Sequence, residues 1–164
     1  MITLVLGGAR SGKSLVAERL AARLPSPVTY VATAVVAAHD PDHVARVAAH
    51  QARRDPAWTT IEADADLAAV LRSAHGSVLV DSLGTWLTAH DDLAPDVEAL
   101  CQALTERTGD VVLVSEEVGL GVHPSTQLGR RFRDALGLVN HAVAEVADDV
   151  LLVVAGRVLL LERP

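Results

Sequence analysis

One segment near the start of the sequence combines glycines, a lysine and a hydroxyl side chain in the order that binds the phosphates of a nucleoside triphosphate. Residues 7–14 satisfy the pattern G-x-x-x-x-G-K-[ST] in full. The glycines let backbone N–H groups turn toward phosphates, and the N-terminus of a following helix adds positive potential. We expect Lys13 to reach the β- and γ-phosphates as a catalytic cation. The nucleotide-binding residues expected in this loop are Gly7, Gly8, Ala9, Arg10, Ser11, Gly12, Lys13 and Ser14.

An acidic residue farther along the chain suits the metal ion that accompanies such a nucleotide. Asp81 directly follows the apolar stretch Val78-Leu79-Val80, which is typical of a buried strand. An acid at this place lies beside the phosphate loop and can hold the coordination shell of Mg²⁺, often through water. We therefore expect Mg²⁺ as the cofactor, with Ser14 and Asp81 as its protein ligands. The alternative is an acid that only caps a turn or a helix.

Three further residues have a spacing that a helix would align on one face. Arg46, His50 and Arg54 are related as i, i+4 and i+8. Two guanidinium groups beside an imidazole suit a phosphate, and a neutral imidazole nitrogen can attack phosphorus. The spacing alone equally describes a solvated helix face. Six other histidines compete for the same role, and spacing does not choose among them.

These residues need a scaffold of alternating strands and helices. An apolar strand before residues 7–14 and a helical pattern after them argue against a Gly-rich turn without a ligand. The alternation predicts a parallel sheet with right-handed crossovers and a closing hairpin at its edge. The fold class expected is therefore α/β, a three-layer P-loop NTPase fold with a mostly parallel sheet. Strands are predicted at 2–6, 28–32, 77–81, 111–115, 150–154 and 158–161, and helices at 13–24, 40–54, 96–107 and 129–146.

Composition sets the remaining limits. A length of 164 residues suits one catalytic domain, 1–164, and a 50% apolar content with few aromatics predicts a core of Val, Leu and Ala. The net charge of −7 without a basic stripe argues against nucleic-acid binding. Cys101 is the only cysteine, so we expect it in the core rather than in an intrachain disulfide. No signal peptide or membrane span is recognisable, and a cytoplasmic protein is expected.

The combination of segments resembles the bifunctional adenosylcobinamide kinase / adenosylcobinamide-phosphate guanylyltransferase family of cobalamin biosynthesis. The resemblance follows the chain in order from the phosphate loop to its last strands. The matching pieces are residues 7–14, 30–34, 46–50, Arg54, Trp58, Glu62, 80–83, 86–88, 118–122, Pro124, 131–134, Gly137, Asn140 and 153–156.

This resemblance implies two reactions. The enzyme would phosphorylate the hydroxyl of adenosylcobinamide with ATP or GTP, and then transfer GMP from GTP to that phosphate with release of pyrophosphate. The family carries the GMP on a histidine, and the matching residue is His50. Glu62 resembles the family's guanine-contacting acid, because a carboxylate can accept two hydrogen bonds from guanine. Further nucleotide-contacting positions implied by the resemblance are Thr33, Ala34, Val35, Gln51, Ala52, Arg53 and Arg54, and family members assemble as trimers, which implies a homotrimer.

Several positions depart from the family's pattern. The family's Ser/Thr-Asn-Glu-Val becomes Ser115-Glu116-Glu117-Val118, and Ala89 replaces an expected Asn. The stretch that is usually rich in acids and Met is Asp40-Pro41-Asp42-His43. Two other functions therefore stay open, namely a small-molecule kinase without guanylyl transfer and a non-catalytic nucleotide-binding module. The presence of His50, Arg54 and Glu62 together argues against both, since a plain kinase needs no such histidine.

Overall fold

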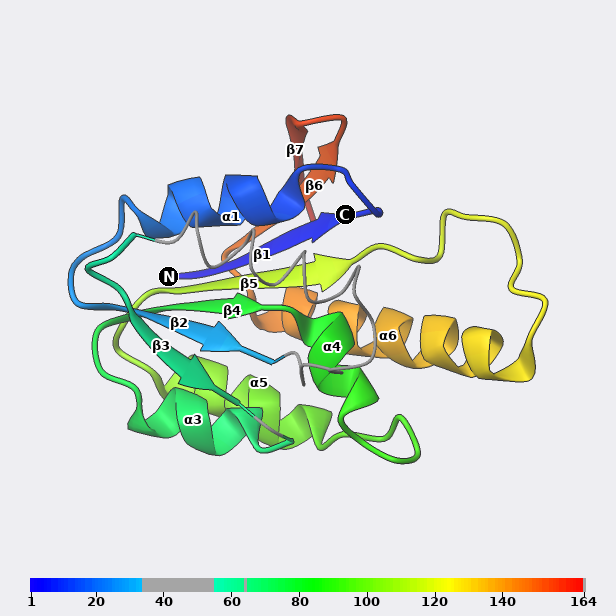
Figure 1. The fold of residues 1–164 in the computed structure, drawn as a ribbon, viewed down its shortest axis with the longest axis horizontal. Coiled ribbons are helices and arrows are strands. Elements are labelled where there is room, and N and C mark those ends of the chain that lie inside the picture. The colour runs from blue at the N-terminus through cyan, green and yellow to red at the C-terminus, as the bar shows by residue number, and fades with distance from the viewer. Residues whose placement is uncertain (34–54, 64, 164) are drawn as a thin grey trace.

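Seven strands of the described chain form one sheet, with a layer of helices on each face (Figure 1). The computed structural model describes residues 1–33, 55–63 and 65–163. The strand order is β3-β2-β4-β5-β1-β6-β7, and every neighbouring pair is parallel except β6 and β7. The strands are β1 (Ile2–Gly7), β2 (Val28–Ala32), β3 (Thr59–Glu62), β4 (Ser77–Asp81), β5 (Val111–Glu116), β6 (Asp149–Val154) and β7 (Arg157–Leu161).

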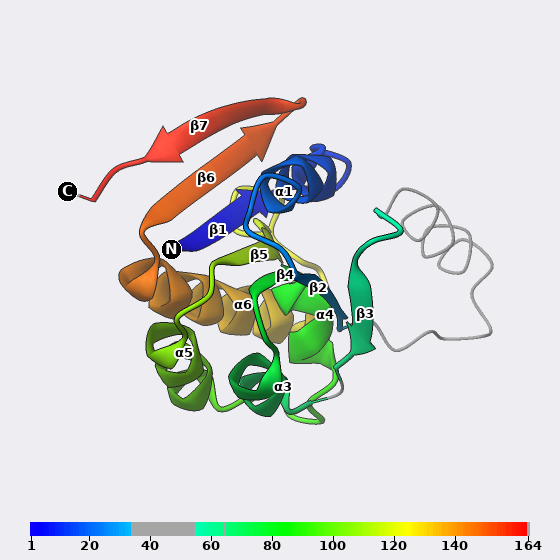
Figure 2. The same cartoon turned by 90° about the vertical axis from the view of Figure 1, so that its left-hand side faces the viewer.

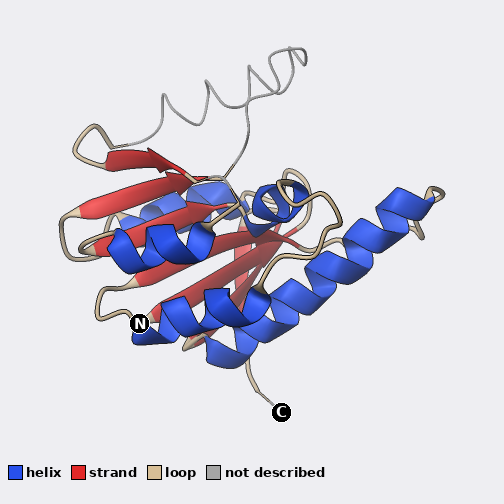
Figure 3. Ribbon diagram, turned by 90° about the horizontal axis from the view of Figure 1, so that it is seen from below, coloured by secondary structure: helices blue, strands red, loops and turns tan. Residues whose placement is uncertain are grey.

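The helices divide unequally between the two faces of the sheet (Figure 2). Helix α1 covers one face, and α3, α4, α5 and α6 cover the other (Figures 2 and 3). Their bounds are α1 (Lys13–Ala21), α3 (Leu67–Ser73), α4 (Leu83–Thr88), α5 (Val97–Glu106) and α6 (Gln127–Val146). This arrangement confirms the three-layer α/β architecture expected from the sequence.

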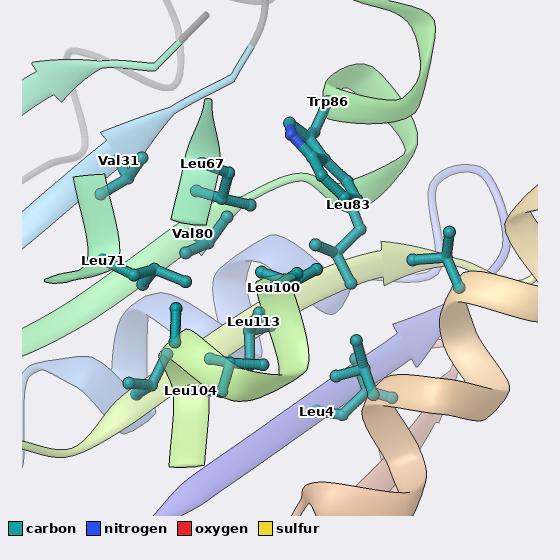
Figure 4. Close-up of a cluster of buried hydrophobic side chains, with 14 of the residues drawn as sticks. Leu4, Val31, Leu67, Leu71, Val80, Leu83, Trp86, Leu100, Leu104 and Leu113 are labelled. Atoms are coloured by element: carbon teal, nitrogen blue, oxygen red, sulfur yellow. The ribbon is translucent and has the colours of Figure 1, made fainter. Parts of the chain in front are cut away.

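The alternation of side chains along the strands explains the two buried layers. Val5 of β1 packs toward α1, whereas Leu4 and Leu6 on the same strand pack toward the opposite helices. Both sets are buried, so the strand reads as a continuous apolar run rather than an alternating one. Leucines from β1, β5, α3, α4 and α5 meet in the larger layer, with Leu100 and Leu113 among them (Figure 4).

Most predicted elements are present with small differences at their ends. Strands β2 and β4 have the predicted bounds, and α5 and α6 begin directly after the capping side chains of Asp96 and Thr126. Helix α1 ends at Ala21 rather than at residue 24. After Ala21 the chain tightens into i→i−3 hydrogen bonds from the N–H groups of Arg23 and Leu24, and Pro25 disfavours helical geometry at residue 24. The predicted hairpin of β6 and β7 lies at the sheet edge.

Three described elements were not predicted. Strand β3 has four residues, three of them exposed, and therefore carries no buried apolar run. Helix α3 is one of two short helices between strands, and α4 is stabilised locally by a capping box between Ser82 and Thr85. The predicted helix over 40–54 lies outside the described residues.

Two smaller expectations have clear outcomes. Cys101 is half-buried against the larger core layer, with its thiol donating to the carbonyl of Ala142, so the predicted core position is confirmed only in part. Burial raises the pKa of this thiol. Among the described helices, none combines the length and hydropathy that crossing a bilayer requires.

Candidate functional site

The carboxyl ends of three neighbouring strands bring the predicted phosphate loop and two acids to one edge of the sheet. Strand β1 leads into the loop, β4 ends at Asp81, and β5 lies between them and ends at Glu116 (Figure 1). Gly7 is the register partner of Glu116 on one side and of Val153 on the other. The crevice at the carboxyl ends of parallel strands is where open α/β sheets bind ligands.

The phosphate loop has a backbone shape that depends on glycine. Gly12 is the N-cap of α1 and has φ = 95°, in the left-handed region that side chains disfavour. The N–H of Ser11 donates to the carbonyl of Gly8 at 3.3 Å, and the N–H of Lys13 to the Ser11 hydroxyl, also at 3.3 Å. The loop thus turns tightly into the N-terminus of α1, as a phosphate cradle requires.

The turn of the β6–β7 hairpin contacts this loop. The N–H of Gly156, in the hairpin turn, donates to the carbonyl of Ser11 at 2.8 Å. The same turn also lies close to Gly12, because a Cβ added to Gly12 would be 3.4 Å from the Cα of Gly156. The hairpin therefore helps to fix the loop conformation.

Lys13 lies between the phosphate loop and the end of β5. Its Nζ lies 3.5 Å from the carbonyl oxygen of Gly8 and 3.6 Å from Oε1 of Glu116, and its side chain is 12% exposed. An ammonium group at this place is suited to offset the negative charge of a triphosphate.

Asp81 is held by a tyrosine from the adjacent strand. The hydroxyl of Tyr30 donates to Oδ2 of Asp81 at 2.9 Å. Strand β5 separates Asp81 from the phosphate-loop strand, so the acid shares the edge with the loop without being its direct neighbour. The next residue, Ser82, caps α4, so the capping role belongs to the serine and leaves the Asp81 carboxylate at the strand end.

The hydroxyl of Thr33 is buried and hydrogen-bonded within the protein, so it does not offer the nucleotide contact that was expected. It is 1% exposed, and its hydroxyl donates to the carbonyl of Ser82 at 2.6 Å. It also accepts from the Ser82 N–H at 2.9 Å and lies 2.6 Å from the Thr85 hydroxyl. Thr33 thereby ties the end of β2 to the start of α4.

The remaining predicted site residues fall into two groups. Glu62 is exposed at the end of β3, in register with Ala32 of β2. The other positions lie outside the described residues: Ala34, Val35, His50, Gln51, Ala52, Arg53 and Arg54. The structure therefore assembles the phosphate loop, Asp81 and Glu62 along the carboxyl edge of the sheet.

Sequence reasoning missed Glu116 as a site residue. The signal was present, because Glu116 directly follows the apolar residues 111–114 and Ser115, much as Asp81 follows its own strand. Its partners needed the fold. Asn140 of α6 donates to the carbonyl oxygen of Glu116 at 3.0 Å, and the Ser115 hydroxyl lies 2.6 Å from Oδ1 of Asn140.

Comparison with known proteins decides the family. The chain matches the family described as cobinamide kinase / cobinamide phosphate guanyltransferase over residues 3–161. This protein belongs to that family. It is 47% identical to the bifunctional adenosylcobalamin biosynthesis protein CobP of Pseudomonas aeruginosa, across 95% of this chain and 94% of that protein. It is 34% identical to the bifunctional adenosylcobalamin biosynthesis protein CobU of Salmonella typhimurium, across 95% and 97%.

A solved structure supports the fold. The KaiC-like protein PH0186 of Pyrococcus horikoshii superposes with a TM-score of 0.51 at 14% sequence identity, over 92% of this chain and 71% of that chain. At this identity the likeness concerns the fold alone. Together with the phosphate loop between β1 and α1, it confirms the predicted α/β P-loop fold.

Proposed function

We propose that the protein phosphorylates the hydroxyl of adenosylcobinamide with ATP or GTP and then transfers GMP from GTP to the new phosphate. The products of the second step are adenosylcobinamide-GDP and pyrophosphate. One observation carries the proposal: a complete phosphate loop, with Lys13 at its mouth, lies in a chain that matches the kinase/guanylyltransferase family over residues 3–161. The relatives named above are both bifunctional proteins of adenosylcobalamin biosynthesis.

In the phosphorylation step, the loop and Lys13 hold the β- and γ-phosphates. The Ser14 hydroxyl and the Asp81 carboxylate are oxygen donors at the same edge, and such donors fit Mg²⁺, which uses few protein ligands beside phosphates and water. Bound there, Mg²⁺ would neutralise charge on the phosphates. The chain's own contribution is a rigid backbone cradle, fixed by Gly12 and by the hairpin contact at Ser11.

In the guanylyl step, we assign the nucleophile to His50 and guanine recognition to Glu62. A neutral imidazole nitrogen would attack the α-phosphorus, and Arg54 would offset charge as pyrophosphate leaves. Support comes from the family match across these positions and from the exposed carboxylate at the end of β3. The other nucleotide contacts proposed are Ala34, Val35, Gln51, Ala52 and Arg53.

The deciding experiment follows a label from GTP to the protein. The protein is incubated with [α-³²P]GTP and Mg²⁺, and we expect an acid-labile, base-stable adduct that is discharged by adenosylcobinamide phosphate. His50→Asn should form no adduct and no adenosylcobinamide-GDP, yet keep measurable phosphorylation of adenosylcobinamide, because only the nucleophile is removed.

A matched control is His75→Asn, which removes a histidine between α3 and β4, at the opposite edge of the sheet. This variant should label as wild type does. A labelled adduct persisting in His50→Asn would show that another residue carries the GMP. A wild-type protein that phosphorylates adenosylcobinamide without forming any adduct would favour the kinase-only alternative.

We also infer that the protein assembles as a homotrimer, as the family resemblance implies. The described surface offers support for self-association at the edge strand β7. Val158, Leu159, Leu160 and Leu161 are all between 41% and 58% exposed, although successive residues point to opposite faces of the sheet. An exposed apolar edge strand is a surface that proteins normally cover.

A further inference from the structure

Glu116 is an acid at the centre of the site that the proposed function has not used. It ends β5, the strand between the phosphate-loop strand β1 and the Asp81 strand β4. Its Oε1 lies 3.6 Å from Nζ of Lys13, and the two side chains are 30% and 12% exposed. The carboxylate therefore lies beside the ammonium group that is expected to contact the phosphates.

The Glu116 carboxylate is restrained at this position by its surroundings. The Ser82 hydroxyl donates to Oε2 at 3.1 Å. A Cβ added to Gly84 would collide with the same oxygen, so the glycine leaves the space that the carboxylate fills. On the main chain, Asn140 donates to the Glu116 carbonyl oxygen at 3.0 Å. The negative charge is therefore built into the mouth of the loop rather than carried by a freely moving side chain.

This negative charge is a property of the present chain rather than a requirement of the chemistry. The family pattern that the sequence resembles has an asparagine at the position of Glu116. An amide oxygen accepts hydrogen bonds as a carboxylate oxygen does, but it carries no charge. The main difference between the two side chains is therefore electrostatic, and its effect falls on the charged ligands of the site.

A metal-free nucleoside triphosphate and its magnesium complex meet this charge differently. The metal-free triphosphate brings a large negative charge to the loop, where the Glu116 carboxylate repels it and pairs with the cation that it needs. A divalent cation on the phosphates lowers that negative charge and so weakens the repulsion. Because Lys13 and Glu116 are partly withdrawn from solvent, salt and water screen these charges incompletely.

We propose that Glu116 makes the phosphate loop selective for the magnesium complex of the nucleotide over the metal-free nucleotide, an inference that rests on the proposed function. Before a nucleotide binds, the Glu116 carboxylate is the counter-ion of Lys13, at 3.6 Å. A metal-free triphosphate has to displace this counter-ion and then remain beside it. The magnesium complex brings a positive charge of its own, which offsets the displaced carboxylate.

The test measures by calorimetry how the β,γ-imido analogue of ATP binds to wild type, Glu116→Gln and Glu116→Asp, with Mg²⁺ or with EDTA in its place. Without metal, Glu116→Gln should bind at least about tenfold more tightly than wild type, because the repulsion and the competing anion are removed together. With Mg²⁺ the two proteins should differ by less than about threefold. Glu116→Asp keeps the charge and should keep the wild-type preference for the magnesium complex.

Two further variants separate the local charge from side-chain shape and from net charge. Glu116→Asn is shorter than Glu116→Gln but equally neutral, and it should show the same gain in metal-free binding. Glu106→Gln is the matched control, because it removes an exposed acid at the C-terminal end of α5, just before β5 begins and away from the loop. It should bind the analogue as wild type does, with and without Mg²⁺.

Three results would overturn the assignment. One is a metal-free affinity of Glu116→Gln within about threefold of wild type. Another is an equal gain with and without Mg²⁺, which would show a general effect on binding without selectivity. The third is the same gain in Glu106→Gln, which would trace the effect to net charge. A wild-type protein that binds the magnesium complex but does not phosphorylate adenosylcobinamide would instead contradict the proposed function alone.

Discussion

Lys13 and Glu116 place opposite charges at the mouth of one loop, and removing either has a different effect on binding. Lys13 is the only lysine in the sequence. Its ammonium group is expected to contact phosphate oxygens directly, whereas Glu116 opposes them. The pair is partly screened by solvent, so its main consequence is the placement of both groups rather than stability.

Lys13→Ala should lower the affinity for ATP and GTP by at least tenfold and abolish both reactions. Losing a hydrogen bond to a charged group costs on the order of 1.5–3 kcal/mol, which corresponds to that factor or more. Calorimetric titration with each nucleotide measures the effect, and unchanged affinity would contradict the assignment. Arg72→Ala, which removes an exposed cation at the opposite sheet edge, is the control and should bind as wild type.

The single lysine also permits a direct readout in the unmodified protein. Besides the N-terminus, Lys13 carries the only primary amine of the chain, so amine-specific acylation followed by mass spectrometry reports on this residue alone. Bound triphosphate should protect it from acylation, while the exposed N-terminus continues to react.

The residues predicted from the sequence are those whose role is local. The phosphate loop is contiguous, so its pattern alone predicts roles for Lys13 and Ser14. Glu116 gains its place only through register, because β5 sets it opposite Gly7, a residue from the far end of the chain. Thr33 shows the converse case, since its hydroxyl turned out to bind Ser82 and Thr85 rather than face the site.

At the scale of the elements, burial decides which ones a sequence reveals. Strands β2 and β4 are covered on both faces and appear as uninterrupted apolar runs with clear ends. Strand β3 lies at the sheet edge with three exposed residues of four, and its pairing with β2 rather than its own side chains makes it a strand. Helix α4 likewise depends on a six-residue segment with its own capping box.

Substitutions at two glycines test separately how the backbone conformation of a connection and that of a helix affect stability. Gly76, between α3 and β4, has φ = 71°, and a Cβ there would press on the carbonyl oxygen and ring of Pro27. Gly76→Ala should therefore destabilise the fold by about 1–2 kcal/mol or more. Gly137 lies exposed within α6, and nothing stands within 4 Å of an added Cβ. Gly137→Ala should stabilise the fold by roughly 0.5–1 kcal/mol, since alanine favours a helix interior.

Chemical denaturation measures both free energies of unfolding. Opposite signs for the two variants are expected, because the same added methyl group meets a left-handed turn in one place and a regular helix in the other. Changes of the same sign would mean that these backbone conformations do not control stability as the structure indicates.

At the scale of the whole molecule, the two outermost strands of the sheet differ. Strands β3 and β7 form the two edges (Figure 2). Strand β3 is largely polar, whereas β7 is apolar on both faces. The turn that joins β6 to β7 also donates to the phosphate loop at Ser11. Contacts made by β7 with another subunit would therefore act close to the site that holds the triphosphate.

Self-association through β7 should depend on salt concentration and on the apolar side chains of the strand. Each chain carries a net charge of −7, so like-charged subunits repel one another and apolar contact must offset that repulsion. Salt screens exposed charges over about 8 Å at physiological ionic strength, so the oligomer should tighten as salt is raised.

Leu159→Lys and Leu160→Lys place a charge on opposite faces of β7, and at least one should shift the protein from trimer to monomer in analytical ultracentrifugation. The variant that does so identifies the contacting face. Leu138→Lys, at a position of α6 that is 71% exposed, is the control and should remain trimeric. A wild-type monomer, or trimers in both β7 variants, would show that this edge is not the interface.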